Sequence, residues 1–249
     1  MATTSITVEE TPLVRQLLYR ADDALILGHR LSEWTGHAPM LEEELALANI
    51  ALDLIGQARL LYAYAGALTG HGEDQLAYLR DASAWRNCLL VELPNRDFAF
   101  TMTRLFLFAA LADPFWRAAT VSPDSTIAAT AAKAEKETAY HLRHAAEWLI
   151  RLGDGTEESH RRALTAVDDL WPYTGELFAD IEGDAMPNPA SLHQVWNETV
   201  DSALSRAALA RPQDGWMQSG GRAGRHTEHL GYLLAELQYL QRTYPGATW

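Results

Sequence analysis

Apolar residues recur at intervals of three and four along almost the whole chain, which is the spacing of one buried face of an α-helix. The first such stretch begins at Pro12, a residue suited to the first turn of a helix, and ends near Gly36. We find no run of alternating apolar and polar residues, the pattern that would indicate a half-buried strand. The helical period therefore predicts an all-α protein.

Glycine, proline and capping residues divide this period into segments. We expect helices over residues 12–35, 40–68, 73–91, 95–120, 122–152, 156–180, 191–209 and 226–242. Pro114 lies inside the fourth segment and is expected to kink or break it. Residues 184–189 are the most linker-like stretch. Long helices with short connections predict an antiparallel bundle, the usual frame of ferritin-like metal proteins and also of many plain scaffolds.

Length and composition indicate one domain. The chain has 249 residues, of which 48% are hydrophobic, so we expect a single core over residues 1–249 with a flexible segment at residues 1–10. A net charge of −13 argues against binding to nucleic-acid phosphates, but not against a protein partner. Cys88 is the only cysteine, which excludes a disulfide within the chain and a cysteine-rich metal site.

Neither export nor membrane insertion is indicated. The first residues lack a basic segment followed by an apolar run, so no signal peptide is expected. The longest purely apolar run, residues 105–112, is far shorter than the roughly 20 residues that a membrane-spanning helix needs. We therefore expect a soluble, cytoplasmic protein with no membrane contact.

A di-iron bundle needs a glutamate from each of two helices and an E-x-x-H pair from each of two others, because residues three apart share a helix face. The only E-x-x-H match is Glu157 with His160, beside Arg161 at a predicted helix start. A solvated helix start is the favoured interpretation of that match. A basic, glycine-rich loop at residues 220–225 lacks the spacing of a phosphate-binding P-loop, and a capped helix start is again favoured for the residues after it.

Two predicted helices nevertheless carry polar side chains through apolar sequence. These are Asn49, Asp53 and Gln57 on the second helix, and Glu137, His141 and His144 on the fifth. One interpretation is a polar core network that includes Asn49, Asp53, Glu137 and His144, since buried charges need partners. The other is an active metal oxidase with ligands Asp53, Glu137, His141 and His144. We favour the network, because neither helix carries an E-x-x-H pair.

Three segments together resemble a known family. They are LILGHRLSEW at residues 25–34, LANIALDLIGQAR at residues 47–59, and GRHTEHLG at residues 224–231 with ELQYL at residues 236–240. The chain is similar in these segments to the C subunits of the bacterial phenylacetyl-CoA epoxidase, also called the ring-1,2-epoxidase. The resemblance extends from about Leu13 to Trp249.

This resemblance implies a ferritin-like bundle with extra C-terminal helices, and a place in a multicomponent monooxygenase of aerobic phenylacetate catabolism. In that family the related A subunit carries the di-iron site and the acyl-CoA, and the C subunit pairs with it. A reductase passes electrons from NADPH, and a small B subunit completes the complex. The implied function of this chain is a non-catalytic structural subunit without a cofactor of its own.

The two iron-binding motifs of the A subunit can be aligned with this chain. The segment D-E-A-G-H falls on residues 53–57, which puts Leu54 and Gln57 at ligand positions. The segment K-E-E-S-F-H falls on residues 136–141, which puts Thr138 and His141 there. Of the four ligands only the histidine at 141 is kept. The resemblance therefore implies a vestigial site that binds no metal.

Several of the eight tryptophans stand beside polar or turn-forming residues, and Trp34, Trp85 and Trp216 are candidates for a partner interface. The alternative is that they close helix ends within this chain. The sequence is compatible with three functions: the structural subunit, the metal oxidase, and a stand-alone helical homodimer. We also expect the structural subunit to self-associate when alone.

Overall fold

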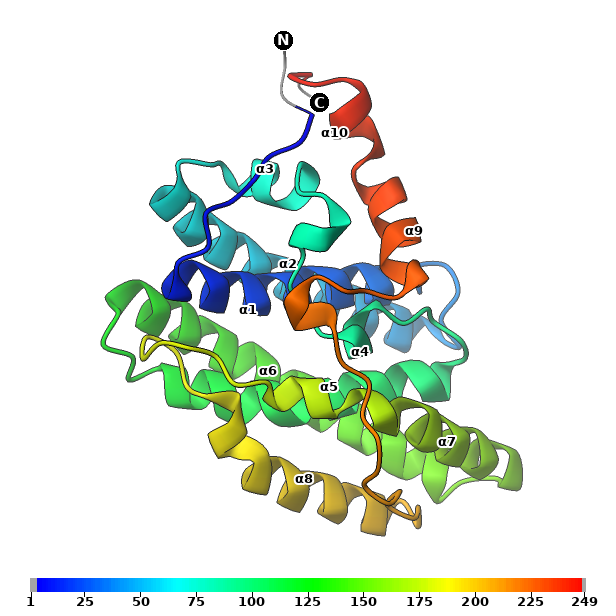
Figure 1. Cartoon of the computed structure of the whole chain (residues 1–249). Helices are drawn as coiled ribbons and strands as arrows, with labels where there is room; N and C mark the ends of the chain where they lie inside the picture. The colour runs from blue at the N-terminus through cyan, green and yellow to red at the C-terminus, as the bar shows by residue number, and fades with distance from the viewer. Residues whose placement is uncertain (1–3, 248–249) are drawn as a thin grey trace.

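Ten α-helices and no strand occur in residues 4–247, the part of the chain that this computed structural model describes (Figure 1). The four longest are α1, Pro12–Ser32; α2, Leu41–Thr69; α5, Phe98–Ala119; and α6, Ser125–Gly153. The others are α3, Glu73–Tyr78; α4, Leu89–Glu92; α7, Glu157–Leu170; α8, His193–Arg206; α9, Glu228–Leu237; and α10, Tyr239–Thr243. The prediction of an all-α protein is confirmed.

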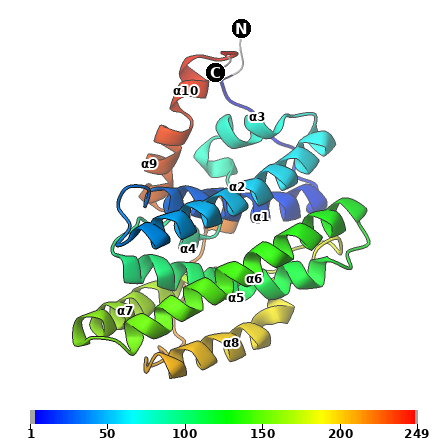
Figure 2. The same ribbon diagram turned by 180° about the vertical axis from the view of Figure 1, so that it is seen from behind.

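The four longest helices form two hairpins that stack on one another. α1 packs along α2, α5 packs along α6, and the hairpins meet where α2 lies against α6. α7 and α8 pack on the α5–α6 hairpin, whereas α3, α9 and α10 lie on the far side of the α1–α2 hairpin (Figures 1 and 2). Buried apolar side chains from all four long helices join in one hydrophobic core.

α5 is the most deeply buried helix. Both α2 and α5 are long and apolar enough to cross a membrane by length and composition, but 89% of the most apolar window of α5 is buried within the protein, against 50% for α2. Pro114 does not break α5, contrary to expectation, and the helix continues to Ala119. A proline inside a helix costs about 3 kcal/mol. The buried Phe115 and Trp116 that follow it contribute about 2–3 kcal/mol each, so packing outweighs the lost hydrogen bond.

The prediction of one helix over residues 73–91 is wrong. α3 has six residues, a 3₁₀ turn follows at Ala82–Ala84, and α4 has four residues. The chain between them donates backbone N–H groups to α1 rather than to a helix of its own. The N–H of Arg86 donates to Asp22 at 2.7 Å, and that of Cys88 to Asp23 at 2.8 Å. Hydrogen bonds to two buried carboxylates therefore override the local helical pattern.

Two other segments are also shorter helices than expected. The one predicted over residues 156–180 is helical to Leu170 and continues as 3₁₀ turns around Pro172. The one predicted over residues 226–242 is interrupted at Gln238, where α9 gives way to α10. The side-chain amide of Gln238 donates to the carbonyl groups of Ala77 and Arg80, which ties this point to the end of α3.

The flexible segment expected at residues 1–10 is partly tied to the bundle. Residues 1–3 lie outside the described residues. The backbone N–H of Ile6 donates to the carbonyl of Leu79 at 2.9 Å. The Glu10 carboxylate forms ion pairs with Arg15 and Arg86.

Candidate functional site

The positions aligned with iron ligands lie where α2 meets α6. Leu54 and Gln57 are on α2, Thr138 and His141 are on α6, and each side chain is between 1% and 3% exposed. Within each pair the residues are three apart, so both side chains point to the same side of their helix. The two helices therefore present these four positions to the protein interior, as a site in a helical bundle would require.

Hydrogen bonds within the protein satisfy the polar groups at these positions. The Gln57 amide donates to the Glu137 carboxylate at 2.9 Å, which joins α2 to α6. Nε2 of His141 lies 3.1 Å from Oδ2 of Asp53 and makes a second bridge. The Thr138 hydroxyl donates to a carbonyl one turn earlier in α6, at 2.9 Å. Leu54 packs in the hydrophobic core.

A third bridge lies further along the same contact. Nε2 of His144 is 3.0 Å from Oε2 of Glu43, and the ring of Tyr140 stacks on the imidazole with 5.6 Å between centroids. Asn49 lies on the exposed side of α2 and joins none of these bridges. The side chain of Asp53 is 37% exposed. The residues expected to form one polar network thus form separate pairs along the edge of the helix contact.

These contacts are separate pairs and not one cluster. Asp53 with His141 and Glu43 with His144 are separate two-residue contacts, and Glu137 binds an amide instead. Among residues 4–247 there is no group of three or more His, Cys, Asp or Glu side chains that could hold a metal ion. A di-iron bundle needs several carboxylates and histidines that converge, so the ligand set of the metal-oxidase hypothesis is not assembled.

The E-x-x-H match at the start of α7 also has a structural explanation. Glu157 is exposed to solvent. Nδ1 of His160 lies 2.6 Å from the carbonyl of Gly153, which is the last residue of α6. His160 therefore ties the start of α7 to the end of α6.

The main buried polar network is centred on α1, and the sequence interpretation missed it. Asp22 and Asp23 are both fully buried. Asp22 binds the Arg80 guanidinium at 2.5 Å and accepts from the Tyr62 hydroxyl at 2.5 Å, while Asp23 binds Arg222 at 2.7 Å. Burial, reinforced by the Asp22 carboxylate, raises the pKa of Tyr62 well above its usual value. The feature of the sequence that could have indicated this network is the pair of adjacent acidic residues inside an apolar helix.

The glycine-rich loop at residues 220–225 binds the carboxylate of Glu176, a residue of the same chain. The N–H groups of Gly220 and Arg222 donate to one oxygen of the Glu176 carboxylate at 2.9 and 3.0 Å, and the N–H of Leu89 donates to the other at 2.9 Å. A Cβ on Gly221 would lie 2.2 Å from a backbone oxygen, so the loop fits tightly against its neighbour. The loop therefore has a structural role, because it holds neighbouring segments of the chain together.

The histidine after that loop anchors α9. Nδ1 of His226 is 2.7 Å from Oε2 of Glu92, and Nε2 is 3.1 Å from the carbonyl of Trp85. The other Glu92 oxygen accepts from the N–H of Thr227 at 2.6 Å. Thr227 stands at the N-cap position of α9, but its side chain makes no capping hydrogen bond, so Glu92 and not a side-chain cap holds this helix start.

The three candidate interface tryptophans have different environments. Trp85 is fully buried within this chain, with the Arg80 guanidinium 4.6 Å from its ring centroid, so its assignment to a partner interface is wrong. Trp34 is partly buried, donates to the Thr101 hydroxyl at 3.1 Å and packs edge-on against Phe98. Trp216 is 77% exposed.

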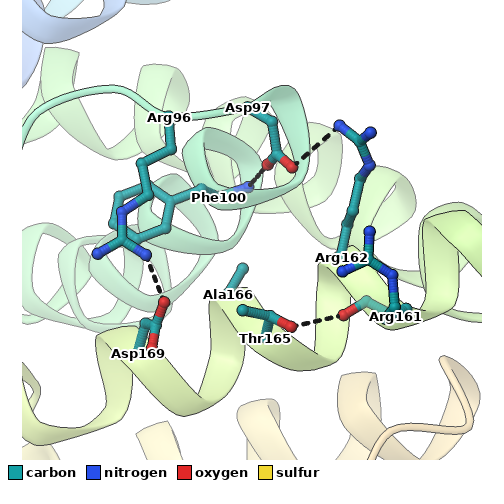
Figure 3. Close-up of a pocket in the computed structure, with 8 residues that line it drawn as sticks. All are labelled: Arg96, Asp97, Phe100, Arg161, Arg162, Thr165, Ala166 and Asp169. Atoms are coloured by element: carbon teal, nitrogen blue, oxygen red, sulfur yellow. Dashed lines mark hydrogen bonds and ion pairs between the residues drawn. The ribbon is translucent and has the colours of Figure 1, made fainter.

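A small surface pocket lies between the start of α5 and α7 (Figure 3). Its volume is about 120 Å³, and each of its charged groups forms an ion pair, Arg161 with Glu158 outside the pocket. Arg96 forms an ion pair with Asp169, and Arg162 forms one with Asp97. These ion pairs neutralise the arginines and connect the start of α5 with α7. The pocket is therefore a place where salt bridges hold two helices together at the surface.

Comparison with known proteins identifies the family. Residues 1–249 match the phenylacetic acid catabolic protein family, PaaA_PaaC. The C subunit of the 1,2-phenylacetyl-CoA epoxidase of Escherichia coli (strain K12) is 46% identical over 246 residues, which covers 95% of this chain and 99% of that protein. The resemblance found in the sequence is confirmed, and the helical bundle fits the ferritin-like fold expected from it. This chain belongs to the phenylacetic acid catabolic protein family.

Proposed function

We propose that the chain is a non-catalytic structural subunit of a phenylacetyl-CoA 1,2-epoxidase in aerobic phenylacetate catabolism, and that it pairs with a homologous di-iron catalytic subunit. Its similarity to the C subunit of the Escherichia coli enzyme supports membership in such a complex. One observation supports the non-catalytic role. The four buried positions that align with iron ligands hold Leu54, Gln57, Thr138 and His141. In this proposal a B subunit and a reductase complete the cytoplasmic complex.

The chemistry of the α2–α6 contact supports the loss of metal. Carboxylates that converge without a cation repel one another, and an unpaired buried charge costs several kcal/mol. Leu54 and Thr138 bring no charge to this contact. The remaining Glu137 has neutral Gln57 at 2.9 Å and Lys133 at 3.6 Å. We therefore expect this chain to be stable without iron, and in the proposed complex the di-iron centre and the NADPH-derived electrons belong to partner subunits.

Metal analysis tests the non-catalytic role. The chain is produced alone in iron-supplemented medium, purified without chelators, and its iron content is measured by mass spectrometry. We expect far less than one iron per chain. A content of about two irons per chain would favour the metal-oxidase alternative, because a di-iron centre holds two.

Co-expression tests the pairing. The chain and the catalytic subunit are produced together, with an affinity tag on one of them, and the eluate is analysed by size-exclusion chromatography. We expect a stable complex and a higher soluble yield of the catalytic subunit. If the two proteins run as separate peaks when mixed at micromolar concentration, the pairing is refuted. A chain-only dimer would then support the stand-alone homodimer.

A further inference from the structure

α2 exposes a row of large apolar side chains to solvent. Leu41, Leu45, Leu52 and Leu60 are 68%, 57%, 66% and 41% exposed. At 100° per residue these four lie within about 100° of the helix circumference, so they form one stripe along α2, in which the exposed Glu42, Asn49 and Arg59 are interspersed. Burying such a stripe is favourable, and contiguous exposed apolar surface on a protein marks interaction sites.

The neighbouring helix carries a basic stripe. The exposed residues of α6 within about 80° of its circumference are Ser125, Ala129, Lys133, Lys136, Tyr140, Arg143, Glu147 and Arg151. Four of the five charged side chains are basic, in a chain whose net charge is −13. Among residues 4–247, no carboxylate lies within ion-pair distance of Lys136, Arg143 or Arg151.

The two stripes form one continuous face. A Cβ added to Gly56, which lies in the α2 stripe, would be 3.9 Å from Nζ of Lys133 on α6. Tyr140 stacks on His144, which in turn bridges to Glu43 of α2. Figure 2 shows α2 and α6 crossing the side of the molecule turned to the viewer. We call this surface the α2–α6 face.

The size of the α2–α6 face suits a stable interface. Each helix has 29 residues, and at 1.5 Å per residue it is about 43 Å long. Two helices of this length at about 8–10 Å separation present a strip roughly 20 Å wide, or at most about 860 Å². This is the area that each partner contributes to a standard protein–protein interface, about 800 Å².

We propose that the α2–α6 face docks the catalytic subunit, through a pair of helices that presents apolar side chains to α2 and carboxylates to α6. This inference rests on the proposed function. Charge selects the occupant: the leucine stripe needs an apolar partner, and Lys136, Arg143 and Arg151 need acidic ones. A second copy of this chain fits less well, because on its own α2–α6 face Lys136, Arg143 and Arg151 outnumber the exposed Glu42 and Glu147, so mostly like charges would meet.

Lysine footprinting tests the location, since Lys133 and Lys136 are the only lysines in the chain and both lie on the α2–α6 face. The free chain and its purified complex with the catalytic subunit are treated with an amine-acetylating reagent, and modification is followed by mass spectrometry. The urea-unfolded chain gives the rate of unprotected lysine. We expect both lysines to react in the free chain and at least about tenfold more slowly in the complex.

Each other outcome has a defined meaning. An intact complex in which both lysines react as in the free chain overturns the docking face and leaves the proposed function standing. Failure to form any complex refutes the proposed function and this inference with it. If both lysines are already protected in the chain alone, and the catalytic subunit does not slow their modification further, the occupant is a second copy. That result overturns the proposal.

A matched pair of variants gives a second readout. Leu45→Glu with Leu52→Glu changes two exposed residues on the α2–α6 face, and helix content measured by circular dichroism should stay unchanged. Val195→Glu introduces one carboxylate at an exposed position on α8, which packs on the α5–α6 hairpin and lies away from α2. We expect the double variant to bind the catalytic subunit at least about 100-fold more weakly, and Val195→Glu less than about threefold. Equal affinity of the double variant and the unmodified chain would overturn the proposal.

Discussion

Replacing Asp22 by asparagine tests whether the buried network on α1 holds the fold together. The substitution keeps the shape of the side chain but removes the charge opposite Arg80, whose guanidinium is fully buried and 2.5 Å away. Burial alone would lower the pKa of Arg80, but Asp22 and Tyr62 outweigh it and raise that pKa. Arginine is not deprotonated near neutral pH in proteins, so without Asp22 the guanidinium stays charged and loses its carboxylate partner. Breaking one partner of a buried ion pair costs about 3–5 kcal/mol. For a domain of this size that lowers Tm by roughly 6–20 °C.

Urea unfolding followed by circular dichroism measures this loss. Arg80→Met is made as well, alone and together with Asp22→Asn, because removing both charges leaves no unpaired ion and should restore part of the stability. Glu158→Gln is the control, since Glu158 pairs with Arg161 on the exposed surface, and its urea midpoint should not change. An Asp22→Asn midpoint equal to that of the control, or strictly additive losses in the double variant, would refute the reasoning.

Three further predictions concern buried or partly buried positions. Restoring carboxylates with Leu54→Glu and Thr138→Glu should lower the Tm of the iron-free protein by about 10 °C or more, because neither charge has a partner; an unchanged Tm would contradict their burial. Burial raises the pKa of the Cys88 thiol well above its usual value, so a thiol reagent should label native protein only at the rate of unfolding. Burial lowers the pKa of His29, so the unfolded chain binds more protons than the folded chain as pH falls through about 6.5, and stability falls there. His29→Gln should therefore lose less stability than the unmodified chain between about pH 7.5 and about pH 5.5 in urea titrations.

The long helices could be predicted from the sequence because their information is local. The segment expected over residues 40–68 is α2, Leu41–Thr69, and the one expected over residues 122–152 is α6, Ser125–Gly153. A steady apolar period, a capping residue such as Asp124 at the start and a glycine at the end define such helices without reference to the rest of the chain.

The buried network could not be predicted from the sequence, because its partners are distant along the chain. Asp23 binds Arg222, which is 199 residues away, and Asp22 binds Arg80, which is 58 residues away. No periodicity or motif connects residues at such separations. The same contacts explain the failed helix at residues 73–91, because the backbone there is held by carboxylates on α1 and not by its own carbonyl groups.

The α2–α6 contact links the positions aligned with iron ligands to the proposed docking face. Gln57 stands at a ligand position and binds Glu137, and Glu137 forms an ion pair with Lys133 on the exposed face. The side chain that replaces a ligand inside the bundle therefore also positions a charged group outside it. In a di-iron bundle the metal would fix the spacing of these helices. Here the side-chain bridges across the contact fix it, and they thereby set the shape of the surface that a partner would meet.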